Sequence, residues 1–322
     1  MDSIALREYQ AQAQYIQFEQ WHIGCFSPVS LLLTSSNDKP VEIDKPVILF
    51  LHGFPSASYD WHYQWQALQD SHICIGMDFL GFGISDKPYP HQYSLQQQTD
   101  AVCVLLEHMQ AVGIHSCHVV AHDYGVSVAQ ELVERSQAAL TNSADSDSAK
   151  SADNHSTTVL PVALQSVTFL NGGLFAALHK PLFTQKLLKS SLGAIVAKLM
   201  NKRTLYKSFT QIFGPTTPPS ETLIDDLWQL LLSHDGRRVI PSVLGYIDER
   251  AVFAQRWQDA LVNSKIPLAF INGVHDPISG QHMLDEFIRL LPNAKTFALD
   301  VGHYPQIEAP EAVTKALLEC WS

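Results

Sequence analysis

Short, nearly continuous apolar runs recur along the chain, and each ends in a glycine-containing or otherwise tight turn. They are PVILFLHG (46–53), HICIGMDFLGFG (72–83), CHVVAHDYG (117–125), LQSVTFLNGG (164–173), IPLAFINGVHD (266–276) and AKTFALDVGH (294–303). Runs of this length without alternation are typical of strands buried on both faces, as in a parallel sheet. We therefore predict that these runs form one mostly parallel sheet.

Amphipathic segments of helical length lie between several of these runs. They are Ser94–Val112, Val126–Arg135, Gln281–Leu291 and Pro310–Trp321. Strands that alternate with helices are typical of a doubly wound α/β fold, in which helices cover both faces of the sheet. This alternation predicts the fold class.

Two stretches interrupt the alternation. Residues 175–261 lack strand signals and have helical spacing, with a loop predicted at FGPTTPPSE (213–221), so we expect an inserted helical cap. Thr141–Thr158 is rich in Ser, Asp, Asn and Thr, which predicts a flexible surface loop. The predicted organisation is a core of residues 1–174 and 262–322 with a cap of residues 175–261.

Composition narrows the class of protein. Apolar residues make up 46% and charged residues 16% of the 322 residues, with a net charge of −11. The acidic balance speaks against a nucleic-acid partner, and low charge favours a small apolar or neutral organic substrate, together with water. The N-terminus lacks a signal-peptide pattern, and no run of about 20 apolar residues predicts a membrane span. Five scattered cysteines without a C-x-x-C pair suggest reduced thiols, so a cytoplasmic location is expected.

The strongest motif is Val119-Val120-Ala121-His122-Asp123-Tyr124-Gly125, which follows a predicted strand and precedes a predicted helix. It matches the G-x-S-x-G nucleophile turn in position, with Asp123 in place of serine. A carboxylate is already ionised and can displace a leaving group at saturated carbon, which forms an ester with the enzyme. Asp123 could alternatively be a helix-capping residue.

A base and its partner follow in the chain order of the α/β hydrolases. Asp276 comes after the fifth apolar run, and His303 comes after the sixth. We expect His303 to activate water against the ester and Asp276 to orient the imidazole and stabilise its charged form. Nearby histidines show no metal-binding spacing, so neither a metal nor a cofactor is expected.

The turn His52-Gly53-Phe54-Pro55 follows the first apolar run. In this fold a backbone amide of this turn and the amide after the nucleophile form the oxyanion hole. That assigns the amides of Phe54 and Tyr124 to this role. A cis bond before Pro55 is a further possibility, and a simple tight turn is the alternative.

With these motifs the chain resembles the epoxide hydrolase and haloalkane dehalogenase branch of the α/β hydrolases, and within it the mesoderm-specific transcript proteins. The closer match is carried by SYDWH (58–62), DFLGFGISDKPYPHQYS (78–94), HDYGVSVAQEL (122–132), NGGLFAALHKPLFTQKLLK (171–189), FGPTTPPSE and HYPQIE. The likeness runs from about Pro46 to the C-terminus. It implies an α/β-hydrolase fold with a mostly parallel, doubly wound sheet and an inserted helical cap.

The resemblance also implies site residues. It gives Asp123 as nucleophile, Asp276 as charge partner and His303 as base. Tyr246 matches a cap tyrosine that protonates the oxygen of an opening epoxide. His52, Pro55, and either Tyr206 or Phe213 are expected at the substrate.

Two positions depart from the dehalogenases of this branch. Tyr124 stands where those enzymes carry a halide-binding Trp, and Phe54 where they commonly carry Asn. Epoxide hydrolysis through an aspartyl ester is therefore the first expectation, and carbon–halogen hydrolysis is the alternative. A hydrolase-fold binding protein without turnover is an alternative from another class.

Overall fold

The computed structural model describes residues 3–31, 43–144 and 160–322, and the described residues form a sheet of eight strands. The strand order is β1-β2-β4-β3-β5-β6-β7-β8. All six predicted strands are present and parallel to one another: β3 (Val47–Leu51), β4 (Ile73–Met77), β5 (Ser116–Ala121), β6 (Ala163–Leu170), β7 (Leu268–Gly273) and β8 (Lys295–Leu299). The α/β-hydrolase fold class is thereby confirmed.

The sheet begins with an antiparallel hairpin that the apolar pattern did not predict. It consists of β1 (Ala13–Phe18) and β2 (Trp21–Phe26), and β2 pairs antiparallel with β4. The turn residue Glu19 has a φ of 51°, a conformation for which the sequence gives no glycine or asparagine signal. Without that signal, two short strands with interspersed glutamines did not stand out.

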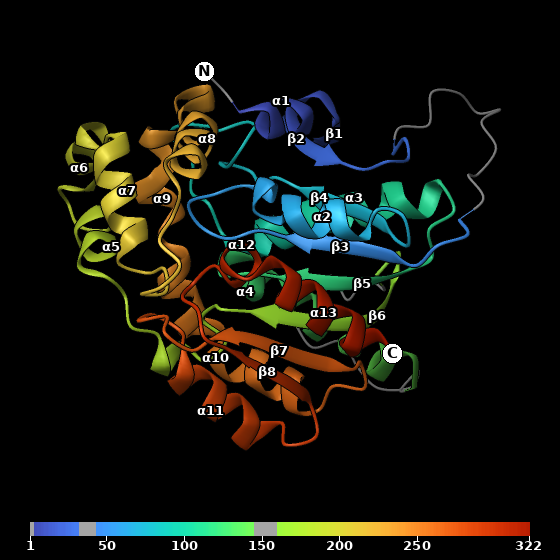
Figure 1. The fold of residues 1–322 in the computed structure, drawn as a ribbon. Helices are drawn as coiled ribbons and strands as arrows, with labels where there is room; N and C mark the ends of the chain where they lie inside the picture. Colours follow the sequence, from blue (N-terminus) through green and yellow to red (C-terminus); the bar gives the residue numbers. More distant parts are fainter. Residues whose placement is uncertain (1–2, 32–42, 145–159) are drawn as a thin grey trace.

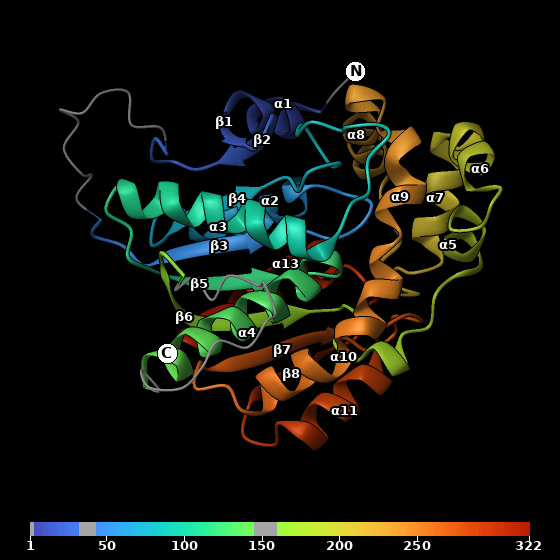
Figure 2. The same ribbon diagram turned by 180° about the vertical axis from the view of Figure 1, so that it is seen from behind.

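Helices cover both faces of the sheet. In Figure 1 the near face carries α2 (His62–Leu68) and α13 (Pro310–Trp321), while Figure 2 shows α3 (Leu95–Ala111) and α4 (Tyr124–Ala144) on the opposite face. Strand alternation fits this arrangement, because Ile48 and Phe50 pack with α2 and α13 whereas Leu49 and Leu51 join the core on the other face. A further core helix, α11 (Gln281–Leu290), lies against β7 and β8.

Helix α4 is longer than predicted. It continues beyond Arg135 to Ala144, so the first four residues of the predicted loop Thr141–Thr158 are helical. This part of the loop prediction is wrong, because polar residues such as Thr141 and Asn142 can continue an existing helix even though they do not favour starting one. The rest of the predicted loop, residues 145–158, lies outside the described residues.

Helices fill the segment between β6 and β7, which we call the helical insertion (residues 175–261). They are α5 (Phe183–Leu188), α6 (Gly193–Leu199), α7 (Lys202–Thr210), α8 (Glu221–Leu232), α9 (Ile240–Val243) and most of α10 (Tyr246–Val262). Residues 213–220 form a loop that ends where Ser220 caps α8, close to the prediction. In Figure 1 the insertion lies beyond the carboxyl ends of the parallel strands. Its assignment as a separate cap domain stays a prediction.

Within the described ranges, none of the helices has the length and apolarity needed to cross a membrane.

Candidate active site

The turn between β5 and α4 holds Asp123 in a conformation that few residues adopt. Its φ is 43°, and its backbone N–H donates to the Asn171 carbonyl at 2.8 Å. The next turn residue, Gly125, packs so tightly that an added Cβ would lie 2.6 Å from the Leu51 carbonyl oxygen. A sharp turn of this kind projects the side chain clear of the strand, as a nucleophile requires.

The Asp123 carboxylate is buried among groups that stabilise negative charge. Oδ2 accepts the Phe54 N–H at 3.0 Å, and Oδ1 lies 3.6 Å from Nη2 of Arg250. Burial tends to raise the pKa of Asp123, but the charge of His303, then those of Arg250 and His122, and the Phe54 hydrogen bond lower the pKa overall. Asp123 is therefore ionised at neutral pH.

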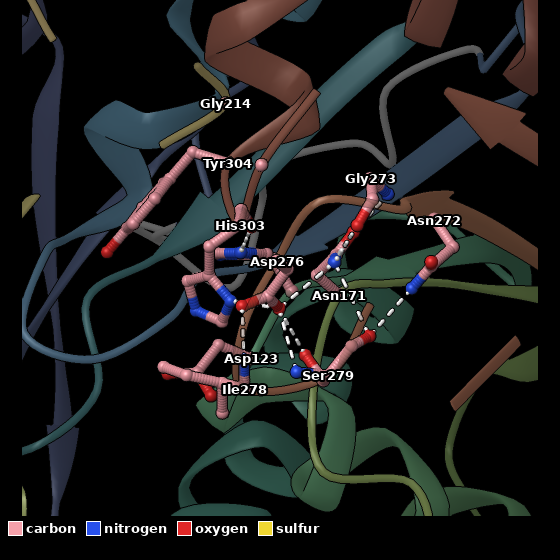
Figure 3. Close-up of polar contacts among 12 residues, drawn as sticks. Asp123, Asn171, Gly214, Asn272, Gly273, Asp276, Ile278, Ser279, His303 and Tyr304 are labelled. Carbon is pink, nitrogen blue, oxygen red and sulfur yellow. Dashed lines mark hydrogen bonds and ion pairs between the residues drawn. The ribbon is translucent and has the colours of Figure 1, made fainter. Parts of the chain in front are cut away.

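His303 and Asp276 form a buried pair at the same end of the sheet (Figure 3). Nδ1 of His303 and Oδ2 of Asp276 are 2.7 Å apart. Asp276 also accepts hydrogen bonds from Asn171 Nδ2 at 3.1 Å and from Ser279 Oγ at 2.6 Å. Burial opposes the charge of Asp276, yet the charge and hydrogen bond of His303 with the Ser279 and Ile278 donors lower its pKa to about 2.

The same pair sets the protonation of the imidazole. Burial tends to lower the pKa of His303, but the charge and hydrogen bond of Asp276, together with the Asp123 charge, raise the pKa to about 9. The site at rest thus holds an imidazolium between two carboxylates. Loss of either negative charge would lower the pKa of His303 and favour its neutral form.

The turn His52-Gly53-Phe54-Pro55 lies beside Asp123, and its Phe54–Pro55 bond is cis, a possibility that the sequence left open. Tyr124 is the first residue of α4, so its amide has no acceptor inside the helix. The Phe54 amide already binds Asp123. Both predicted oxyanion donors therefore lie beside the nucleophile.

His52 holds its own turn through both ring nitrogens. Its Nε2 accepts the Phe79 N–H at 3.0 Å, so the ring proton is on Nδ1 and is donated to the Gly53 carbonyl at 2.8 Å. Neither ring nitrogen is left for a substrate. The ring therefore fixes the turn, and a contact between His52 and the substrate stays a prediction.

Of the aromatic candidates in the helical insertion, Tyr246 lies nearest the nucleophile turn. Its ring centroid is 4.9 Å from that of Tyr124, and its buried hydroxyl has no hydrogen-bond partner among the described residues. Burial and the charge of Asp123 raise the pKa of Tyr246, so the phenol keeps its proton.

The other two candidates differ in position. Phe213 stacks on Tyr304, next to His303, with ring centroids 5.4 Å apart. Tyr206 is exposed on α7, and its side chain makes no hydrogen bond within the described part of the chain. Tyr206 is therefore an incorrect choice of site residue, because the turn of α7 that buries Leu205 and Phe209 directs it outward.

The structure adds a residue that the sequence did not reveal. Arg250 of α10 is 1% exposed, donates to the Asp123 carbonyl at 2.8 Å and to Ser127 Oγ at 2.7 Å, and lies over the Tyr246 ring. Its Nη1 has no hydrogen-bond partner among the described residues. Arg250 lies among other charged residues of α10, so the sequence alone does not distinguish it from a surface cation.

Backbone contacts bind the helical insertion to the histidine turn. The His303 N–H donates to the Ile212 carbonyl at 2.8 Å. Glu308 accepts the amides of Gly214 at 2.7 Å, Gly302 at 2.9 Å and Tyr304 at 2.9 Å. The loop after α7 and the turn that carries His303 therefore share one carboxylate.

Space near the site is narrow and mostly apolar. A small cavity lies between the Phe54–Pro55 turn and the insertion, and its lining includes Phe82, Leu231 and Val243. Asp123 and His303 are only 4% and 2% exposed. Among the described residues no group of three His, Cys, Asp or Glu side chains has the arrangement of a metal site. The geometry thus offers an ionised nucleophile, a base and amide donors.

Known proteins share this architecture. The chain is 39% identical over 280 residues to a mesoderm-specific transcript homolog protein of Bos taurus, covering 84% of this chain and 77% of that protein. A shorter match, 36% identical over 93 residues, links 29% of this chain to 22% of epoxide hydrolase 1 of Caenorhabditis elegans. The haloalkane dehalogenase DatA of Agrobacterium tumefaciens has a similar structure, with a TM-score of 0.71, 19% identity and coverage of 96% and 95% of the two chains. Residues 46–310 match the family described as alpha/beta hydrolase fold. The chain therefore belongs to the α/β hydrolase family.

Proposed function

We propose that this hydrolase opens small, apolar epoxides to diols through an ester on Asp123. The observation that carries the proposal is the buried, ionised Asp123 carboxylate at the nucleophile turn, with one oxygen held by the Phe54 amide. A carboxylate in this position can attack saturated carbon without first losing a proton. Partial likeness to a protein named epoxide hydrolase supports the same reaction class.

In the first half-reaction, Oδ1 of Asp123 attacks a ring carbon and the carbon–oxygen bond of the epoxide breaks. The phenol of Tyr246 donates its proton to the departing oxygen and later regains one from water. The raised pKa keeps the phenol protonated in the resting enzyme, and the phenol can still donate because an alkoxide is more basic than a phenolate. The product of this step is an ester between Asp123 and the new alcohol.

In the second half-reaction, neutral His303 takes a proton from water, and the hydroxide adds to the Asp123 carboxyl carbon. The amides of Phe54 and Tyr124 hold the resulting oxyanion. When this intermediate collapses, the ester bond breaks and the imidazolium protonates the leaving alkoxide. The carboxylic acid thus formed on Asp123 releases its proton to water, which balances the proton that the Tyr246 phenolate regains from water. Asp276 stabilises the imidazolium throughout, since its pKa of about 2 keeps it ionised.

Carbon–halogen hydrolysis uses the same first step and is the second candidate, favoured by the likeness to the haloalkane dehalogenase. A leaving halide needs side-chain hydrogen-bond donors that stabilise its negative charge. Phe54 supplies none from its side chain, and the hydroxyl of Tyr124 is buried without a hydrogen-bond partner in the described structure. The epoxide reaction uses Tyr246 and therefore accounts for more of the site.

The proposal is tested with a panel of aromatic and aliphatic epoxides beside haloalkanes and short esters. The parent enzyme should turn over epoxides, and Asp123→Ala should abolish that turnover. With an accepted epoxide, His303→Gln should accumulate an adduct on the peptide that carries Asp123, detected by mass spectrometry, because water is no longer activated. An unmodified peptide in that variant, despite turnover by the parent, would reject the ester mechanism. Absence of turnover on the whole panel would favour the silent binding protein.

A further inference from the structure

The outer helices of the insertion carry an unusual excess of positive charge. Seven of the 21 Lys and Arg residues lie between positions 180 and 207, and none of the 32 Asp and Glu residues lies between positions 175 and 220. They are Lys180, Lys186, Lys189, Lys198, Lys202, Arg203 and Lys207. Lys189 pairs with Asp248 and Lys202 with Asp225, while the other five make no ion pair within the described ranges. One third of the cations of a chain with net charge −11 thus lie in this one region.

Helix α6 in this region buries small residues and exposes large apolar ones. Its buried positions are the small residues Gly193 and Ala197, whereas Leu192, Ile195 and Leu199 are 54%, 59% and 71% exposed. The spacing of these three residues is i, i+3 and i+7, so they form one apolar stripe on the solvent side. Phe183, at the start of the adjoining α5, is 78% exposed. A helix at a protein surface ordinarily shows the opposite arrangement.

The position of this surface is also distinctive. Figures 1 and 2 show α5, α6 and α7 at the outer edge of the insertion, on the side away from the sheet. No other described element covers the apolar stripe of α6. A second copy of the chain is a poor occupant, because it would bring two groups of unpaired cations together.

We propose that this surface, the exposed stripe of α6 with Phe183 and the unpaired cations of residues 180–207, docks on an anionic lipid bilayer. Apolar side chains on a projecting helix can enter the boundary between headgroups and acyl chains, and lysine stems can reach the phosphates. Negatively charged headgroups complement the cations. The docking is peripheral, and it is independent of the reaction proposed for Asp123.

Co-sedimentation of the full chain with vesicles tests this proposal. The protein should bind vesicles of phosphatidylcholine mixed with phosphatidylserine, bind phosphatidylcholine alone much more weakly, and dissociate as salt is added. Lys198→Gln with Arg203→Gln should weaken binding about fivefold for each cation removed. Ile195→Ser with Leu199→Ser should weaken it by roughly tenfold or more, since both side chains lose their apolar contact.

The matched control changes an apolar and a cationic residue on α13, Leu318→Ser with Lys315→Gln, both exposed and both outside the insertion. It should bind as the parent does. All variants alter exposed side chains, and equal thermal unfolding temperatures would verify their folding.

Failure of the parent to bind anionic vesicles, or equal binding by the α6 variants and the parent, would overturn the proposal. If the parent does not bind vesicles but forms a dimer through this surface, a second copy of the chain is the occupant instead. Turnover of epoxides plays no part in this readout.

Discussion

At the scale of single residues, the site is governed by the charge balance among Asp123, Asp276 and His303. Two carboxylates around one imidazole raise the pKa of His303 to about 9 in the resting enzyme. Attack by Asp123 converts its carboxylate into a neutral ester, so one of these negative charges disappears. The pKa of His303 should then fall, which prepares the base for the step in which it is needed.

This balance predicts the pH dependence of ester hydrolysis. His303 acts as a base only when it has lost its proton, so the single-turnover rate should rise with pH and level off at or below about pH 9. Asp276→Asn removes the largest influence that raises this pKa. The variant should show a lower inflection and a rate reduced on the order of 10²-fold or more. Stopped-flow measurement of both profiles checks this, and an unchanged inflection in the variant would contradict the assigned pair.

Tyr246 separates the two candidate reactions. Tyr246→Phe should slow epoxide opening by roughly 10²- to 10⁴-fold, because the departing oxygen loses its proton donor. Any haloalkane turnover should be nearly unchanged, since a halide leaves without a proton. Tyr63→Phe, on the exposed surface of α2, is the control. Equal losses on both substrates would mean that Tyr246 only packs against Tyr124.

The residues that sequence could predict are those fixed by chain order and strand ends. Asp123, Asp276 and His303 each follow an apolar run of the sequence, and the carboxyl ends of parallel strands meet at one edge of the sheet. Arg250 was missed because its approach to Asp123 depends on the packing of α10 along α4. The choice between Tyr206 and Phe213 depends on the rotation of α7, which spacing alone did not settle.

At the scale of elements, Glu308 of α12 (Pro305–Glu308) is the junction between the core and the helical insertion. Its carboxylate accepts three amides and the hydroxyl of Thr217. These donors come from the loop after α7 and from the turn that carries His303. The insertion is thus held to the turn that carries the base.

Glu308→Ala should therefore affect both stability and catalysis. Loss of the acceptor leaves several partly buried amides unpaired, which should lower the free energy of unfolding by about 1–3 kcal/mol. Displacement of the His303 turn should reduce turnover by between about tenfold and a hundredfold. Denaturant unfolding and steady-state assays measure the two effects. Glu311→Ala, at an exposed position on α13, is the control and should change neither.

Elements were predictable where burial makes the pattern simple. Strands β3, β4 and β7 are buried along their whole length, and the partly exposed edge strand β8 still coincides with an apolar run of the sequence. The β1–β2 hairpin was not predictable in this way, because it lies at the edge of the sheet and its turn uses Glu19 at positive φ. The predicted end of α4 at Arg135 is too early, because the polar residues that follow it continue the helix to Ala144.

At the scale of the whole molecule, the nucleophile, the base and the oxyanion donors come from the core, whereas Tyr246 and Arg250 come from the helical insertion. The insertion closes over the carboxyl ends of the strands and leaves Asp123 only 4% exposed. A substrate must therefore displace part of this cover or use the narrow space beside Phe54. The same insertion carries the cationic and apolar surface proposed to dock on a bilayer. Substrate entry and membrane docking therefore both involve the helical insertion.

The central claim is that Asp123 attacks the substrate and that water attacks Asp123. A single turnover with excess enzyme in ¹⁸O-labelled water tests it most directly. The ester mechanism predicts largely unlabelled diol and ¹⁸O in the carboxylate of Asp123, because the product oxygen comes from the enzyme. Direct attack of activated water on the substrate would instead place the label in the diol and leave Asp123 unlabelled. Mass spectrometry of the diol and of the Asp123 peptide distinguishes the two results, and labelled diol in the first turnover would contradict the account.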